Sequence, residues 1–99
     1  MNYFIDIDDT LLELVNKEDY YTAIAIPRAI EKVNALYEEG HRIVLWTARG
    51  TVTGRNWRPL TEHQLSQNGV KYHELRFGKP AFDVFIDDKA INAKTWLDQ

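Results

Sequence analysis

Cysteine is absent from this sequence of 99 residues, which excludes a disulfide framework and thiolate ligand sites. Apolar runs that approach the roughly 20 residues of a membrane span are lacking as well. The sequence starts in a strand-like segment, without the basic region and apolar stretch of a secretory signal. Internal repeats and low-complexity segments are also missing. We therefore expect a reduced, cytoplasmic setting and no membrane partner.

An excess of positive charge is lacking too. Lysine and arginine number 12 against 15 acidic residues, and the net charge of -3 argues against a general nucleic-acid binder. The composition, with 44% hydrophobic and 27% charged residues, is that of an ordinary globular protein. At this length a second domain does not fit, so residues 1–99 are expected to form one domain.

The first stretch of the chain is an apolar run that ends in carboxylates. Residues 3–7 are long enough for a strand buried in a sheet. Alternate side chains of a strand share a face, so Asp6 and Asp8 can point the same way at its carboxyl end. In open α/β sheets, ligands bind beyond the carboxyl ends of the strands. The sequence therefore predicts a functional site at this edge.

A second acidic pair, Asp87 and Asp88, follows another apolar run at residues 83–86. If this run is also a strand, four or five carboxylates converge with those of the first strand. Such a cluster is unfavourable unless a cation intervenes. All-oxygen ligation favours Mg²⁺, which we expect as the cofactor.

The remaining elements follow from periodicity and from the positions of proline and glycine. Along the chain we expect a loop or flap at 11–26, a helix at 28–39, a strand at 43–47, a basic loop at 48–58, a helix to 67, a strand near 72–75, a strand at 84–87 and a helix from 92. This order, β-α-β-α-β-β-α, predicts an α/β fold, a minimal three-layer α/β/α sandwich with a small parallel sheet. The connection at 76–82 fits this fold least well, because it is too short to hold the helix that usually joins two parallel strands.

Several other polar residues fall where they can meet an anion. Thr47 ends the second strand with a hydroxyl, and Lys79 lies in a late loop. Arg49, Arg55 and Arg58 belong to the basic loop, where each can contact substrate because guanidinium suits phosphate and carboxylate, or can simply keep the loop soluble. Trp57 in the same loop is expected to pack or to lie against a sugar.

The four motifs stand in one order: Asp6-Ile7-Asp8-Asp9-Thr10, then Thr47, Lys79 and Asp87-Asp88. In this respect the chain resembles the haloacid dehalogenase-like (HAD) hydrolase superfamily, over nearly its whole length. It is most similar to small capless members found with capsule and surface-polysaccharide genes, through residues 46–49, 77–80 and 86–88. The resemblance implies a Rossmann-like core without a cap domain.

The resemblance also implies a role for each matching residue. Asp6 would be the nucleophile that forms an aspartyl phosphate, and Asp8 would protonate the leaving oxygen and then activate water. Thr47 and Lys79 would hold the phosphate oxygens. Mg²⁺ would be held by the Asp6 carboxylate, the Asp8 carbonyl oxygen and Asp87, with Asp88 bound directly or through water.

The five-residue motif also contains a departure from the family pattern. Thr10 would order the loop after the first strand and is a further candidate for substrate contact. Position 9 is often glycine in the superfamily and is Asp9 here. Aspartate tolerates turn conformations, but its added charge could alter metal affinity or leaving-group preference.

The function expected from these residues is Mg²⁺-dependent hydrolysis of a small phosphomonoester, with a sugar phosphate as the first choice. A nucleotide phosphatase that stacks the base on Tyr20, Tyr21 or Trp57 is one alternative, and a noncatalytic module that binds phosphate and Mg²⁺ is another. Without a cap, substrate selection would come from the flap, the basic loop or a neighbouring subunit. A homo-oligomer, in which a neighbouring subunit closes the site, is therefore also considered.

Overall fold

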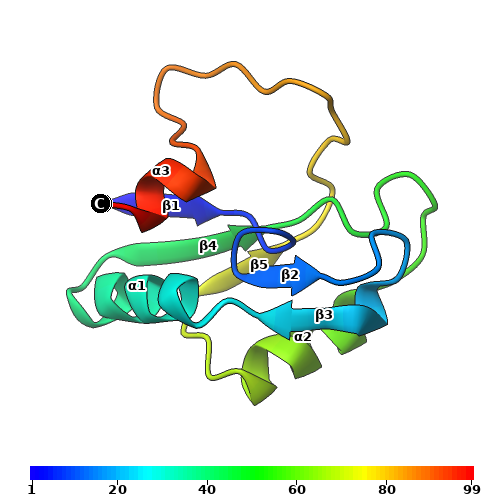
Figure 1. The fold of residues 1–99 in the computed structure, drawn as a ribbon, viewed down its shortest axis with the longest axis horizontal. Helices are drawn as coiled ribbons and strands as arrows, with labels where there is room; N and C mark the ends of the chain where they lie inside the picture. The colour runs from blue at the N-terminus through cyan, green and yellow to red at the C-terminus, as the bar shows by residue number, and fades with distance from the viewer.

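A small parallel sheet forms the centre of the computed structural model, which describes residues 1–99 (Figure 1). Its strands are β1 (Asn2–Ile5), β4 (Arg42–Trp46) and β5 (Glu74–Arg76), in the order β1-β4-β5. Both pairings are parallel, so the three carboxyl ends lie at one edge of the sheet. The predicted fold class, an α/β sandwich of the three-layer type with a small parallel sheet, is confirmed.

Two helices make the crossovers between these strands. They are α1 (Pro27–Glu38) and α2 (Arg58–Gln67), close to the predicted ranges. Each has a proline in its first turn, where the missing N–H costs nothing. Each also ends in a glycine with positive φ, Gly40 at +93° and Gly69 at +67°. In both cases, backbone N–H groups past the end bond back to carbonyls of the last turn, which stops the helix.

The predicted flap at 11–26 contains regular structure that the sequence pattern did not reveal. It holds a short antiparallel hairpin of β2 (Leu12–Leu14) and β3 (Ala23–Ala25), with the 3-10 helix η1 (Tyr20–Thr22) just before β3. Leu11, Leu12 and Leu14 are buried, so the flap is part of the core. Strands of three residues are too short for a clear alternation of apolar and polar positions, which explains why the pattern was missed.

One hydrophobic cluster joins all of these elements. It contains Ile5 and Ile7 from the first stretch, together with side chains of the flap, α1, β4, α2 and β5. In the sheet its members are alternate residues, such as Ile43 and Leu45 of β4, as expected for one face of a pleated strand. This cluster fixes the ends of the strands, and it therefore also fixes the positions of the polar residues that follow them.

The C-terminal part departs from prediction. The helix expected from Asn92 is present as α3 (Ala93–Leu97), capped by the Asn92 side chain, with Trp96 against the core. The strand expected at 84–87 is wrong: the segment has no strand, and every residue from 80 to 92 is exposed. Figure 1 shows it as an arc that stands away from the sheet. The structure contains no helix with the length and apolar character needed to cross a membrane.

Candidate functional site

Asp6 follows β1 directly, and its carboxylate lies near Lys79. This lysine belongs to the segment after β5, the strand at the opposite edge of the sheet. Lys79 Nζ lies 3.6 Å from Asp6 Oδ1, and the lysine side chain is only 15% exposed. The ammonium group also lies 5.9 Å from the ring of Trp46 and 5.4 Å from that of Phe82, within the range of cation–π attraction. The structure thus brings together two of the predicted catalytic residues, although they are distant in the sequence.

Burial raises the pKa of the Asp6 carboxyl group above its ordinary value. The charge of Lys79 opposes this shift, and the charge of Asp8 adds to it. An aspartate in such surroundings holds its proton more tightly than one in water, yet keeps a cation beside it that stabilises the ionised form.

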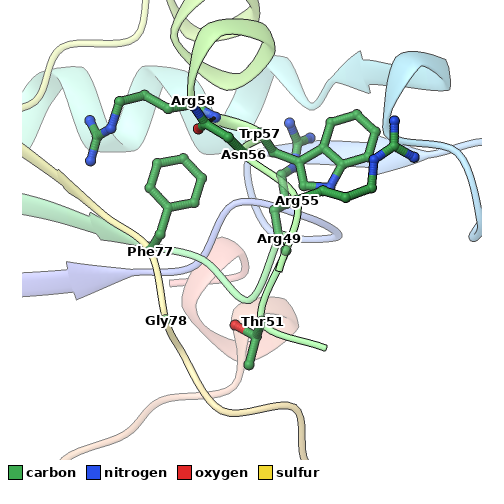
Figure 2. Close-up of a pocket in the computed structure, with 9 residues that line it drawn as sticks. Arg49, Thr51, Arg55, Asn56, Trp57, Arg58, Phe77 and Gly78 are labelled. Atoms are coloured by element: carbon green, nitrogen blue, oxygen red, sulfur yellow. Dashed lines mark hydrogen bonds between the residues drawn. The ribbon is translucent and has the colours of Figure 1, made fainter. Parts of the chain in front are cut away.

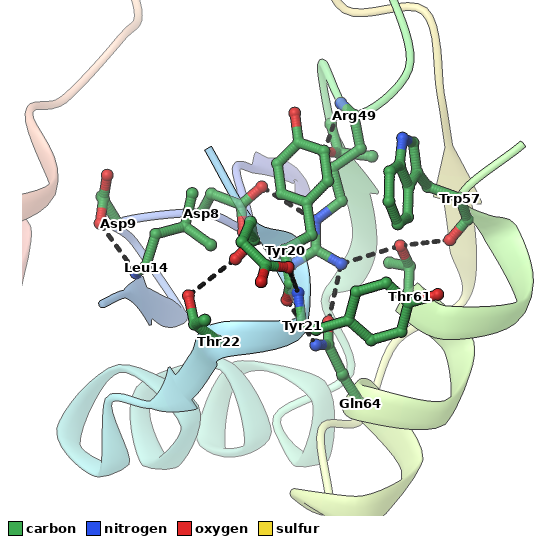
Figure 3. A network of polar contacts seen from close by, with 12 residues as sticks. Asp8, Asp9, Leu14, Tyr20, Tyr21, Thr22, Arg49, Trp57, Thr61 and Gln64 are labelled. Carbon is green, nitrogen blue, oxygen red and sulfur yellow. Dashed lines mark hydrogen bonds and ion pairs between the residues drawn. The ribbon is translucent and has the colours of Figure 1, made fainter. Parts of the chain in front are cut away.

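Asp8 is bound on both oxygens by one arginine (Figure 3). Arg49 Nη2 donates to Asp8 Oδ1 at 2.7 Å and Arg49 Nε donates to Oδ2 at 2.9 Å. The guanidinium group also donates through Nη1 to Thr61 Oγ1 at 3.0 Å and to Gln64 Oε1 at 2.7 Å. Because Arg49 is only 2% exposed and four of its five guanidinium N–H groups donate within the chain, it orients Asp8 instead of meeting substrate. Neither expected role of Arg49, substrate contact or a solvated place in the basic loop, matches this position.

An aromatic pair from the flap and α2 covers this arginine. The Arg49 guanidinium lies 4.8 Å from the ring centre of Tyr20, and Tyr20 meets Trp57 edge to face at 5.0 Å. Gln64 Nε2 donates to the backbone carbonyl of Tyr20 at 2.8 Å, which ties the flap to α2. The flap therefore lies over Arg49, while the Asp8 side chain keeps 18% of its surface exposed.

Thr47 sits where β4 ends and is 1% exposed. Its hydroxyl accepts from the backbone N–H of Arg49 at 3.1 Å, and its carbonyl accepts from the backbone N–H of Lys79 at 3.1 Å. The hydroxyl of Thr51 in turn donates to the Lys79 carbonyl at 2.7 Å. These bonds join the loops after β4 and β5, so the position of Lys79 is set by backbone contacts.

The departure at Asp9 has a structural explanation. Asp9 adopts φ +60°, the left-handed conformation that glycine occupies most easily and aspartate tolerates. Its carboxylate accepts from the Leu14 backbone N–H at 3.2 Å and pairs with Lys17 at 2.9 Å. The added charge is therefore balanced within the flap. Thr10 helps to form the same turn, since its N–H donates to the carbonyl of Ile7 at 3.2 Å.

The structure does not bring the four predicted metal ligands together. Asp87 and Asp88 lie on the exposed segment at 80–92, and no group of three acidic, histidine or cysteine side chains is arranged to hold a metal ion. The physical reason is that residues 84–87 pair with no other strand, so their carboxylates are not carried to the edge of the sheet. Asp6 and Asp8 are instead balanced by Lys79 and Arg49. The residues present therefore do not fit the expected Mg²⁺ site.

Two residues of the site were missed by sequence reasoning. Thr61 and Gln64 are buried on α2 next to Leu65, at helical spacings of three and four. Polar residues that share the inward face of a helix with a core leucine are a signal that could have identified them. Tyr20 was predicted only as a residue that could stack a nucleotide base, and its contact with Arg49 was not predicted because its position depends on the flap.

Arg55 and Arg58 remain near the surface, as expected for a basic loop. Together with Arg49, Trp57 and Phe77 they line a hollow of about 300 Å³ beside the acidic site (Figure 2). Unlike Arg49, neither of these two arginines is paired with a carboxylate in the chain.

Comparison with known proteins identifies a similar structure and no family. Neither the protein-family models nor the curated proteins gave a match. The structure is similar to the crystal structure of a target protein from Vibrio cholerae, with a TM-score of 0.88 and 26% sequence identity. The similarity covers 99% of this chain and 88% of that protein. The whole chain thus has the fold of a known α/β protein.

Proposed function

We propose that the chain hydrolyses phosphomonoesters through a covalent intermediate on Asp6. The observation that carries this proposal is the convergence of Asp6, Lys79 and Thr47 at one edge of a parallel sheet, from segments that follow three different strands. A carboxylate beside an ammonium group can attack the electrophilic phosphorus while the cation balances the negative oxygens, and the Thr47 backbone carbonyl holds the segment that carries the cation.

In the first step, a carboxylate oxygen of Asp6 attacks phosphorus, an acyl phosphate bond forms and the ester P–O bond breaks. The leaving oxygen departs as the alcohol, with a proton that it takes from solvent water. Lys79 balances the charge on the phosphate oxygens during the transfer, because it already lies 3.6 Å from the attacking carboxylate. In the second step, water hydrolyses the acyl phosphate, which restores Asp6 and releases inorganic phosphate.

Asp8 is placed to serve the second step. Both of its oxygens accept hydrogen bonds from Arg49, and each keeps a second lone pair. Such a group can take a proton from the attacking water. Its expected part in protonating the leaving group would require Asp8 to start the reaction with a proton, whereas a general base starts with both oxygens as acceptors, as they are in the pair with Arg49. We assign Asp8 to water activation and derive no step through a metal ion.

The test is phosphate release from a panel of sugar phosphates, nucleotides and phosphorylated acids, in EDTA and in Mg²⁺. Asp6→Asn should lower turnover by about three orders of magnitude or more, since a neutral amide cannot act as the nucleophile. Asp8→Asn should let a phosphorylated protein accumulate, detectable as a gain in intact mass after an acid quench. Phosphate bound without turnover by the wild-type protein would favour the noncatalytic module. Full activity of Asp6→Asn would refute the proposal.

The nucleotide alternative gains no support from the aromatic residues. The Trp57 ring already meets Tyr20, Tyr21 and the Arg55 guanidinium, so its faces and edges are largely engaged. The same substrate panel compares sugar phosphates with nucleotides directly.

A further inference from the structure

Two arginines of the chain have no carboxylate partner, and both line the same hollow. The other four arginines form ion pairs of 3.9 Å or shorter, namely Arg28, Arg42, Arg49 and Arg76. Arg55 and Arg58 form none, and no acidic residue lines the hollow between them (Figure 2). In a chain with a net charge of -3, this is a local excess of positive charge.

Both guanidinium groups are held by aromatic rings. Arg55 lies 4.9 Å from the ring centre of Trp57, and Arg58 lies 4.8 Å from that of Phe77. Arg58 Nη2 donates one hydrogen bond to the Leu75 carbonyl at 3.1 Å, whereas the Arg55 side chain makes no hydrogen bond. A guanidinium group has five N–H donors in a planar fork, so most donors remain free to bind oxygen atoms. Stacking lowers the cost of ordering these side chains when a ligand arrives.

The loop that carries Arg55 is shaped by a glycine. Gly50 has φ +81°, and a Cβ atom there would lie 2.3 Å from the carbonyl oxygen of Arg55. The backbone N–H of Gly54 donates to the Gly50 carbonyl at 2.8 Å. The loop therefore folds back on itself in a way that only glycine permits at position 50. This fold packs the backbone of Arg55 and the ring of Trp57 against Gly50.

Two residues in the wall of the hollow connect it with the acidic site. Arg49 contributes to its wall and also binds Asp8. Gly78 forms another part of the wall and directly precedes Lys79, which faces Asp6. A ligand with its phosphoester at Asp6 can therefore extend into the hollow.

We propose that this hollow binds a second anionic group, a phosphate or a carboxylate, carried by the substrate of the Asp6 site. This inference rests on the proposed function and narrows its substrate class. The preferred substrates are then sugar bisphosphates or phosphorylated acids, and a phosphoester without a second anionic group binds less well. Arg55 and Arg58 bind the second group through charge-assisted hydrogen bonds.

The kinetic test compares substrates that differ only in the second group. Suitable pairs are 3-phosphoglycerate with glycerol 3-phosphate, and fructose 1,6-bisphosphate with fructose 6-phosphate. The wild-type protein should have a kcat/KM at least about tenfold higher for the substrate with two anionic groups in at least one pair. The double variant Arg55→Gln/Arg58→Gln should lose this ratio, mainly through KM. A control that removes two positive charges elsewhere, Arg28→Gln/Lys94→Gln, should keep it.

A binding test by NMR separates this inference from the proposed function. Trp57 lines the hollow, Trp46 lies 5.9 Å from Lys79 Nζ, and Trp96 on α3 serves as a reference. Inorganic phosphate should shift the indole signal of Trp57 in the wild-type protein and in Asp6→Asn, but not in the double variant. A shift of Trp46 reports binding near Asp6 independently.

Two results would overturn the inference. One is a kcat/KM preference for two anionic groups that survives in the double variant, and the other is a Trp57 indole signal that phosphate does not shift. If no substrate is turned over, the proposed function fails and the Trp57 titration alone decides whether the hollow binds anions.

Discussion

Two stretches of the chain have the same local pattern and different structures. Residues 3–8 and 83–88 are both apolar runs that end in aspartates. The first forms β1, which pairs with β4 along four residues and places Ile5 and Ile7 in the core. The second pairs with nothing, and its apolar side chains Val84 and Ile86 are 73% and 92% exposed. The comparison teaches that an apolar run becomes a strand through its partners, and that its carboxylates become a site only then.

The charges of the two stretches differ in the same way. Asp6 and Asp8 each have a cation from another part of the chain, Lys79 and Arg49. Asp87 has only a local contact, in which its carboxylate accepts from the backbone N–H of Lys89 at 2.7 Å. Long-range pairing is what distinguishes the candidate site from a solvated acidic turn.

The largest expected effect comes from breaking the ion pair of the first stretch. Arg49→Leu should lower the free energy of unfolding by about 3–5 kcal/mol, because Asp8, Thr61 and Gln64 would lose their buried partner. Chemical denaturation measures this loss. Arg55→Leu is the matched control, and it should change the stability by less than about 1 kcal/mol because Arg55 is exposed and unpaired. Equal losses in the two variants would contradict the network around Asp8.

The sequence was sufficient to predict much of this first region. Helices α1 and α2 were predictable because proline, apolar spacing and glycine all indicate the same ends. Asp6 and Asp8 were predictable because they directly follow a strand. Lys79 and Arg49 were predicted only as candidates for binding an anion, and their pairing with Asp6 and Asp8 was not predicted, since the loops that carry them are positioned by Thr47 and α2. Such contacts are made across the fold, where local patterns carry no information.

The second prediction concerns pH and Asp6. Because burial raises its pKa in the folded state, the folded protein binds the Asp6 proton more tightly than the unfolded chain does. This contribution to stability is complete below the ordinary pKa of the unfolded chain and is lost as the pH rises through the higher folded-state pKa. At neutral pH, where the bound proton contributes least, Asp6→Asn should therefore match or exceed the wild-type melting temperature, because a neutral amide lacks the burial cost that raises the pKa of Asp6.

The gain should stay below about 1 kcal/mol, since the Asp6 side chain is 37% exposed and solvent screens its charge. Melting curves in EDTA from pH 3.5 to 7.5 measure it as a difference that grows with pH. Glu62→Gln, which alters an exposed carboxylate on α2, is the control. A marked loss of stability in Asp6→Asn at neutral pH would show that the contact with Lys79 outweighs the cost of burial.

The smallest expected effect comes from the second stretch. Asp87→Asn and Asp88→Asn each remove an exposed carboxylate that forms no ion pair within the chain, so both should leave the melting temperature in EDTA within about 2 °C of wild type. Turnover in EDTA should be unchanged too, since neither residue faces Asp6.

The response to Mg²⁺ tests the same contrast more stringently. If it raises the melting temperature or the turnover of the wild-type protein but not of Asp87→Asn, the second stretch folds against the first when the ion is present. The contrast between the two stretches would then be a property of the metal-free chain alone. A response to Mg²⁺ that is the same in all variants would keep the two stretches distinct, because the ion would then act without the second pair of carboxylates.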